Sequence, residues 1–201
     1  MRIISWFTEN TKYQNVIKDY FIDSVEKLNL NNVRVFAVPS KNNWKENTNL
    51  KPDVALNALK NLKDDVLLVD ADATILEYPK LIEEIPEKYD CAMFWLDWNE
   101  WYNNGSNKKE LCSGTLFFRD RLICEDLILT WKKICENNSY PDQKNLELAL
   151  QFFPDLKIYE LPLKYCYITT MPNGDKPFVE CKNPIITHHQ VSRELRRKIN
   201  G

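Results

Sequence analysis

The sequence predicts an α/β fold with a mainly parallel sheet in a single domain. First, 201 residues are enough for one hydrophobic core and too few for two comfortable ones. Second, strand-like and helix-like segments alternate along the first half of the chain. Third, the four branched apolar residues 66–69 run directly into Asp70-Ala71-Asp72. This is the pattern of a strand buried on both faces whose carboxyl end meets a ligand.

The first half has the order strand, helix, strand, helix, strand. Residues 2–7 and 33–38 are rich in apolar residues, and each segment is followed by apolar side chains at helical spacing. This order implies parallel strands joined by right-handed crossovers. The polar segment 40–49 carries Trp44, and its length of about ten residues suggests a functional loop. The expected helices cover residues 16–28 and 51–62.

The second half continues with strands and helices around one polar segment. That segment, 97–109, carries Trp98, Trp101 and Tyr102, whose rings could stack on sugar faces or pack on the sheet edge. Gly114 lies inside an expected strand, where a glycine often marks the close approach of a ligand or another backbone. The expected elements are a short helix from Tyr78-Pro79, strands at 91–96, 111–119, 157–161, 165–168 and 184–189, helices at 122–134 (capped by Asp120) and 142–150, and a basic helix at 190–198.

The composition excludes several classes of protein. A formal net charge of −2 gives no support for binding nucleic acid through bulk charge. No apolar run approaches the roughly 20 residues that span a bilayer, and the apolar N-terminus is too short for a secretory signal. Only four glycines are present, which excludes a Gly-rich phosphate loop and makes metal-bridged nucleotide binding the more natural option. Six scattered cysteines suit buried thiols in a reducing compartment, so we expect a cytoplasmic location.

Asp70 and Asp72 are the first candidates for a metal site. Two carboxylates side by side at a partly dry strand end repel each other unless a positive charge lies between them. A divalent cation would supply that charge. The alternative is that both acids cap the following turn and face water, because the Asp-x-Asp pattern is short and common.

The two histidines of the chain, His188 and His189, are adjacent at the end of an apolar segment near the C-terminus. A histidine on such a strand is often a satisfied core residue, but here it accompanies an independent pair of acids. Two carboxylates and one imidazole suit Mn²⁺ better than Mg²⁺, which prefers oxygen ligands and retained waters.

The order of these motifs resembles that of a known group of enzymes. Asp70-Ala71-Asp72, the strand Ser113 to Phe118, the helix start Asp142-Gln143 and the segment Ile186-Thr187-His188 together resemble the GT-A glycosyltransferases, in particular the glycogenin-like group. The resemblance implies one GT-A (Rossmann-like) domain over residues 1–201, with a mixed, mostly parallel central sheet flanked by helices. Residues 1–98 would form the nucleotide-binding half, and residues 99–201 the acceptor and sugar half.

The resemblance also implies a role for each matching residue. Asp70, Asp72 and His188 would bind the metal, and Asp70 would in addition contact the ribose of the donor. Ser113 and Gly114 would line the donor sugar. Asp142 and Gln143 would lie beside the reacting sugar carbon as catalytic residues. Further substrate contacts are expected from Ser5, Thr8, Tyr13 and Ala71. Lys51 and Arg193 are expected to add positive charge near the departing diphosphate, and the alternative for each is an ordinary solvated charge.

This sequence departs from the glycogenin-like pattern in two respects. That pattern has a glycine and a lysine shortly after its histidine, whereas this chain continues His189-Gln190-Val191-Ser192-Arg193. His189 is therefore a rival ligand, and Arg193 or Arg196 is a candidate for the phosphate contact. The chain is also short for the group, so the acceptor-binding part is minimal or supplied elsewhere.

The expected reaction is the transfer of a hexose-type sugar from a nucleotide-diphosphate sugar, a UDP-sugar by the resemblance, to a saccharide or other hydroxyl acceptor with Mn²⁺ or Mg²⁺. Retention of configuration needs no dedicated base, whereas inversion needs a carboxylate such as Asp142 or Asp97 to deprotonate the acceptor. The resemblance favours retention. The alternatives are a sugar nucleotidyltransferase, which usually carries a Gly-rich basic loop that residues 5–14 lack, and a non-catalytic nucleotide-sugar-binding module. The basic tail could contact a membrane surface or form a solvated helix face.

Overall fold

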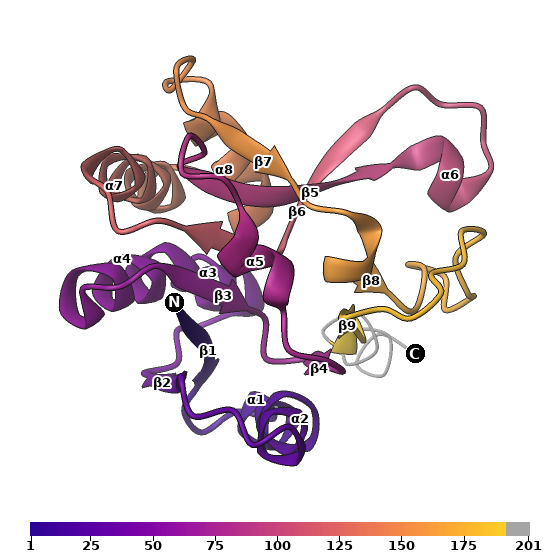
Figure 1. Cartoon of the computed structure of the whole chain (residues 1–201), viewed down its shortest axis with the longest axis horizontal. Helices are drawn as coiled ribbons and strands as arrows, with labels where there is room; N and C mark the ends of the chain where they lie inside the picture. Colours follow the sequence, from indigo (N-terminus) through magenta and orange to yellow (C-terminus); the bar gives the residue numbers. More distant parts are fainter. Residues whose placement is uncertain (192–201) are drawn as a thin grey trace.

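The computed structural model describes residues 1–191, which form a six-stranded sheet with helices on both faces and a second, three-stranded sheet (Figure 1). The strand order of the large sheet is β2-β1-β3-β6-β5-β7. In the described part of the chain, β6 alone runs opposite to the other five strands of this sheet. The expected mixed, mostly parallel α/β sheet in a single domain is thereby confirmed. The strands are β1 (Arg2–Thr8), β2 (Val33–Val38), β3 (Val66–Val69), β5 (Cys91–Asp97), β6 (Lys109–Phe118) and β7 (Ile158–Glu160).

Strand β6 connects the two halves of the large sheet. Its C-terminal part pairs with β3, with Thr115 opposite Val69, and its N-terminal part pairs with β5, with Cys112 opposite Phe94. The register with β5 shifts between Ala92 and Phe94. Ala92 pairs with Phe117 and Phe94 with Cys112, so the stretch of β6 that begins at Ser113 is not regularly paired with β5. Such an irregularity re-aims side chains at the point where it occurs.

Each strand of the large sheet alternates between two hydrophobic cores. Ile3 and Leu67 pack on one face, and their neighbours Ile4 and Leu68 pack on the other, as the period of two requires. This double burial explains the continuous apolar runs in the sequence. The first face is covered by α1 (Tyr13–Ile17), the π-helical turn η1 (Lys18–Ile22), α2 (Asp23–Lys27) and α5 (Lys80–Glu84), and the second by α4 (Lys51–Leu62), α7 (Leu122–Asn137) and α8 (Asp142–Leu150).

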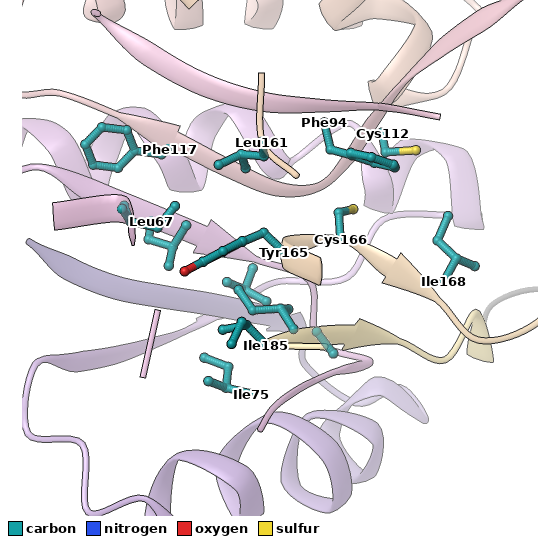
Figure 2. Packing of buried hydrophobic residues seen from close by; sticks show 14 of the residues in the cluster. Leu67, Ile75, Phe94, Cys112, Phe117, Leu161, Tyr165, Cys166, Ile168 and Ile185 are labelled. Atoms are coloured by element: carbon teal, nitrogen blue, oxygen red, sulfur yellow. The ribbon is translucent and has the colours of Figure 1, made fainter. Parts of the chain in front are cut away.

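The small sheet has the order β4-β9-β8 and lies over the first core. Its strands are β4 (Ala73–Ile75), β9 (Ile186–His188) and β8 (Tyr167–Ile168). Figure 2 shows Ile75 and Ile185 on the side of the small sheet, with Phe117 and Leu161 on the side of the large one. Antiparallel pairing of β4 with β9 sets Ala73 opposite His188, which brings the C-terminal histidine beside the Asp70–Asp72 turn.

Two segments expected to be irregular contain short helices. The segment 40–49 includes α3 (Trp44–Thr48), and the Asn43 side chain caps it by accepting a hydrogen bond from the Glu46 N–H. The segment 97–109 includes α6 (Trp98–Tyr102), which the Asp97 side chain caps in the same way. Both caps follow the usual preference for Asn and Asp at this position.

Other expectations need correction. The expected Asp120 cap is wrong, because Arg121 occupies the N-cap position of α7 and its side chain makes no capping hydrogen bond. Strand β4 was not expected, and a 3₁₀ turn, η2 (Leu163–Tyr165), precedes β8. The expected helix 190–198 lies almost wholly outside the described residues. Residues 1–191 include no helix that is long and apolar enough to cross a membrane.

Candidate active site

A cavity of about 530 Å³ opens at the carboxyl ends of β1 and β3. In an open α/β sheet this is the edge at which ligands bind. Thr8 lines the cavity at the end of β1, and Asp70 and Asp72 line it just beyond β3. Residues from both halves of the chain meet here, because β6, α8 and β9 supply the opposite wall.

Asp70, Asp72 and His188 form a cluster in this cavity. One ligand atom from each lies within 4.8 Å of the others. Asp72 is 9% exposed and His188 is 2% exposed. Burial, opposed by the Lys51 charge and reinforced by that of Asp72, raises the pKa of Asp70 to about 6. Asp72 and His188 are buried while the Asp70 side chain is 31% exposed, and a divalent cation between them would relieve the repulsion between the acids.

Hydrogen bonds from the surrounding structure hold the cluster in place. The His188 ring nitrogen Nε2 lies 2.9 Å from the Thr115 hydroxyl, and the Val191 N–H donates to Asp72 Oδ2 at 2.9 Å. The Asp70 N–H donates to the Gly114 carbonyl, also at 2.9 Å. Partners of this kind orient side chains before a ligand arrives.

The structure separates the two histidines. His189 Nε2 lies 2.9 Å from the Thr74 hydroxyl, and its ring contacts that of Tyr20 with the centroids 4.5 Å apart. His188 at the end of β9 therefore lies with the aspartates, whereas His189, just after the strand, lies against Tyr20 of η1 and Thr74 of β4. The geometry therefore favours His188 over its rival as a metal ligand.

Lys51 lies at the start of α4 and joins the acid cluster to the next group of polar residues. Its Nζ lies 2.8 Å from Asp70 Oδ1 and 2.9 Å from Asp142 Oδ2, and it donates to the Ser113 carbonyl at 3.1 Å. Burial alone would lower the pKa of Lys51, but the carboxylates of Asp142 and Asp70 raise it above its usual value. The lysine is a fixed positive charge, neutralised by two aspartates.

Asp142 and Gln143 open α8 and line the cavity. Asp142 Oδ2 accepts hydrogen bonds from both Lys51 and the Ser113 hydroxyl, the latter at 2.9 Å. This carboxylate oxygen is therefore already occupied by Lys51 and Ser113. The other candidate base, Asp97, caps α6 and lines a second cavity instead of the main one.

Most of the expected substrate-contacting residues line the cavity. Ser5 does not, because it is fully buried in β1, and its neighbours Trp6 and Phe7 reach the cavity instead. The geometry gives no support to a direct contact between Ser5 and a substrate. Arg193, like Arg196, lies outside the described residues. Thr8, Tyr13, Lys51, Ala71, Ser113 and Gly114 are all among the lining residues.

Several lining residues were not among the expected site residues. Trp44 comes from α3, inside the segment whose length already suggested function, and Trp101 comes from the aromatic segment 97–109. No sequence motif pointed to Glu110 as a site residue, because it is a single acidic residue near the start of a strand. The further unexpected lining residues are Trp6, Phe7, Asn47, Thr48, Leu96, Tyr102, Cys112, Pro141, Cys166, Ile168 and Gln190.

Gly114 packs against the His188 ring, and this contact leads to a prediction. A Cβ at position 114 would lie 2.7 Å from His188 Cε1, which is too close for the ring to stay in place. We expect Gly114→Ala to lower the affinity for Mn²⁺ by roughly tenfold or more through displacement of the ring. Overpacking should also cost about 1–3 kcal/mol of stability. Isothermal titration with Mn²⁺ and thermal unfolding measure the two effects.

Gly105→Ala is the matched control. Its Cβ would meet nothing within 4 Å, but its φ of +69° is unfavourable for alanine. This variant should therefore lose stability while its Mn²⁺ affinity stays unchanged. An unchanged Mn²⁺ affinity in Gly114→Ala would exclude His188 as a ligand.

Comparison with known proteins gives matches at the level of structure. No protein-family profile and no curated protein sequence matches the chain. A glycosyltransferase involved in the glycosylation of the major capsid of PBCV-1 matches with a TM-score of 0.65 and 11% identity, over 99% of this chain and 98% of that one. Mouse xyloside xylosyltransferase 1 matches with a TM-score of 0.57 and 7% identity, over 96% and 98% of the two chains. The galactosyltransferase LgtC, solved with donor and acceptor sugar analogues, matches with a TM-score of 0.57 and 12% identity, over 94% and 87%. The chain therefore has the GT-A glycosyltransferase fold.

Proposed function

We propose that this protein is a metal-dependent glycosyltransferase that moves a sugar from a nucleotide-diphosphate sugar, a UDP-sugar, to a hydroxyl group of a saccharide or other acceptor. The observation that carries the proposal is the cluster of Asp70, Asp72 and His188 in a cavity at the carboxyl ends of the strands of a GT-A fold. A structural relative, LgtC, was solved with donor and acceptor sugar analogues, which supports the same class of substrates here.

The charges that line the cavity support a metal. Among residues 1–191, four acidic side chains line the cavity, namely those of Asp70, Asp72, Glu110 and Asp142. Lys51 supplies the one lysine or arginine side chain among these described lining residues. Lys51 is itself neutralised by two of these acids. A diphosphate would therefore be repelled unless a cation accompanied it. Two carboxylates and an imidazole form a donor set that fits Mn²⁺, with Mg²⁺ as the second choice.

In the proposed mechanism Asp70, Asp72 and His188 hold the cation. When bound, the ion supplies Lewis-acid stabilisation of the negative charge that builds on the departing diphosphate. Ser113 and Gly114 form the wall against which the donor sugar lies, and Gln143 lies beside the reacting carbon. Because Asp142 is ion-paired with Lys51, transfer with retention, which needs no carboxylate base, is the favoured course.

The two halves of the chain would divide the substrates between them. Residues 1–98 would bind the nucleotide through the ends of β1 and β3 and through Tyr13. Residues 99–201 would bind the donor sugar and the acceptor, and Trp101 and Tyr102 offer rings on which a saccharide could stack. We propose a cytoplasmic location on the basis of the cysteines, all six of which are unpaired thiols.

A panel of nucleotide sugars tests the proposal. We expect at least one UDP-sugar to be hydrolysed to UDP in the presence of Mn²⁺, and not in the presence of EDTA. At a free concentration of about 100 times its Kd, the same donor should stabilise the fold by about 2.7 kcal/mol, which is measurable as a rise in Tm.

The rival functions predict different results for the same panel. Pyrophosphate release from UTP and a sugar 1-phosphate would identify a sugar nucleotidyltransferase. A rise in Tm without turnover of any donor or acceptor would identify a non-catalytic binding module. No rise in Tm and no hydrolysis with any nucleotide sugar would contradict all three functions.

A further inference from the structure

Glu110 on β6 lines the cavity and contacts side chains from α8 and α6. Its Oε1 accepts a hydrogen bond from the Gln143 side-chain NH₂ at 2.8 Å, and its Oε2 accepts one from the Trp98 indole N–H at 2.8 Å. Lys108 Nζ lies 3.7 Å from the same Oε2 and 3.6 Å from the centroid of the Trp98 ring. Both oxygens of the carboxylate are thus engaged by side chains from α8 and α6.

This carboxylate restricts the orientation of the Gln143 amide. An amide has a donor end and an acceptor end of nearly equal size, whereas an ionised carboxylate can only accept. The NH₂ of Gln143 must therefore turn toward Glu110, and its carbonyl oxygen must turn away. That oxygen accepts a long hydrogen bond from the Ser113 backbone N–H at 3.4 Å, and both Ser113 and Gln143 line the cavity in which the donor sugar is proposed to lie.

We propose that Glu110 is a positioning residue that keeps the carbonyl oxygen of Gln143 directed at the donor sugar. The inference rests on the proposed function, because it gives that oxygen a task. Positive charge develops on the sugar carbon as the bond to the diphosphate breaks, and a fixed carbonyl dipole stabilises such charge without reorganisation. Trp98 and Lys108 hold Glu110 in turn, which couples the aromatic segment at the acceptor side of the cavity to Gln143.

Donor hydrolysis by Glu110→Gln provides the kinetic test. A neutral amide at position 110 can donate or accept, so it no longer dictates which end of Gln143 faces the sugar. We expect kcat to fall by about tenfold or more, while KM for the donor and Tm stay close to those of the parent protein. Because Glu110 acts through Gln143, Glu110→Gln should cause no further loss in a Gln143→Ala background.

Glu160→Gln is the matched control, since Glu160 lies on β7 of the same sheet and forms an exposed ion pair with Lys109 at 3.6 Å. It should leave kcat unchanged. Trp98→Phe is the second variant, for use where Glu110→Gln does not fold. It removes the indole N–H that donates to Glu110 and keeps an aromatic ring at this position, so its loss of kcat should also disappear in the Gln143→Ala background. Losses that multiply in the double variants would overturn the proposal.

A spectroscopic test does not depend on activity. The side-chain NH₂ signals of Gln143 in a ¹⁵N-labelled sample are identified by their loss in Gln143→Ala. We expect Glu110→Gln to shift these signals and accelerate their exchange with water, and Glu160→Gln to leave them in place. Unchanged signals in Glu110→Gln would contradict the positioning role. If instead the signals respond as expected but no nucleotide sugar is turned over, it is the proposed function that fails.

Discussion

Replacing Asp72 with asparagine is expected to abolish measurable binding of Mn²⁺ and to reduce kcat/KM for donor hydrolysis by about 10³-fold, because a bound cation contributes several kcal/mol at the departing diphosphate. Asparagine has nearly the same size as aspartate. Its side-chain oxygen can still accept the hydrogen bond that the Val191 N–H donates to Asp72 at 2.9 Å. The substitution therefore removes the charge and leaves the turn in place. Isothermal titration with Mn²⁺ measures the first effect, and release of UDP from the best donor measures the second.

The exposed Asp155 offers a matched substitution of the same type. Asp155→Asn changes the net charge by the same amount and lies outside the cavity lining, so it should leave both quantities unchanged. If Asp72→Asn also retains Mn²⁺ affinity and nucleotide affinity, the two acids only cap the turn between β3 and β4. The metal-dependent reaction would then have no basis in this chain.

The sequence predicted those parts of the candidate site whose residues are close together in the chain. The apolar run 66–69 with its two terminal aspartates predicted both a buried strand and its place at the ligand edge of the sheet. His188 and His189 could not be separated in this way. The choice depends on the pairing of β9 with β4, which sets His188 opposite Ala73. That register involves residues more than a hundred positions apart, and no local pattern reports it.

Long-range contacts explain what the sequence could not show. Lys51 meets Asp142 across 91 residues and Ser113 across 62 residues, and nothing around any of them signals the pairing. The short helices α3 and α6 have five residues each, too few for a helical period to be visible. Ser5 illustrates the opposite difficulty. It lies in the expected strand and near the expected edge, but its side chain does not reach the cavity.

Lys51→Met is expected to lower the free energy of unfolding of the metal-free protein by about 3–5 kcal/mol, which is typical when one partner of a buried ion pair is removed. Methionine fills most of the space but leaves the carboxylates of Asp70 and Asp142 without their shared cation. For a chain of this length the loss corresponds to a fall in Tm of roughly 6–20 °C. Urea unfolding and thermal unfolding measure it.

Lys60→Met is the control on the same helix. Lys60 is exposed, and its Nζ lies 3.8 Å from Glu125, a surface pair of the kind that contributes about 0–1 kcal/mol. A similar loss in both variants would mean that methionine on α4 is destabilising for reasons other than charge. In that case Lys51 would not be the cation that holds the two aspartates.

Adding Mn²⁺ to Lys51→Met distinguishes a structural ion pair from one that also tunes the metal site. In the parent protein a cation at the proposed site would lie beside an ammonium group that already pairs with Asp70 at 2.8 Å. Without that group, Asp70 is free to be neutralised by the metal alone, so Mn²⁺ should bind more tightly and raise Tm by more than it does in the parent protein. Turnover should nevertheless stay low, because Asp142 and Ser113 also lose the lysine that holds them in the cavity wall. A smaller rise in Tm than in the parent protein would mean that Asp70 needs Lys51, and not a metal, as its partner.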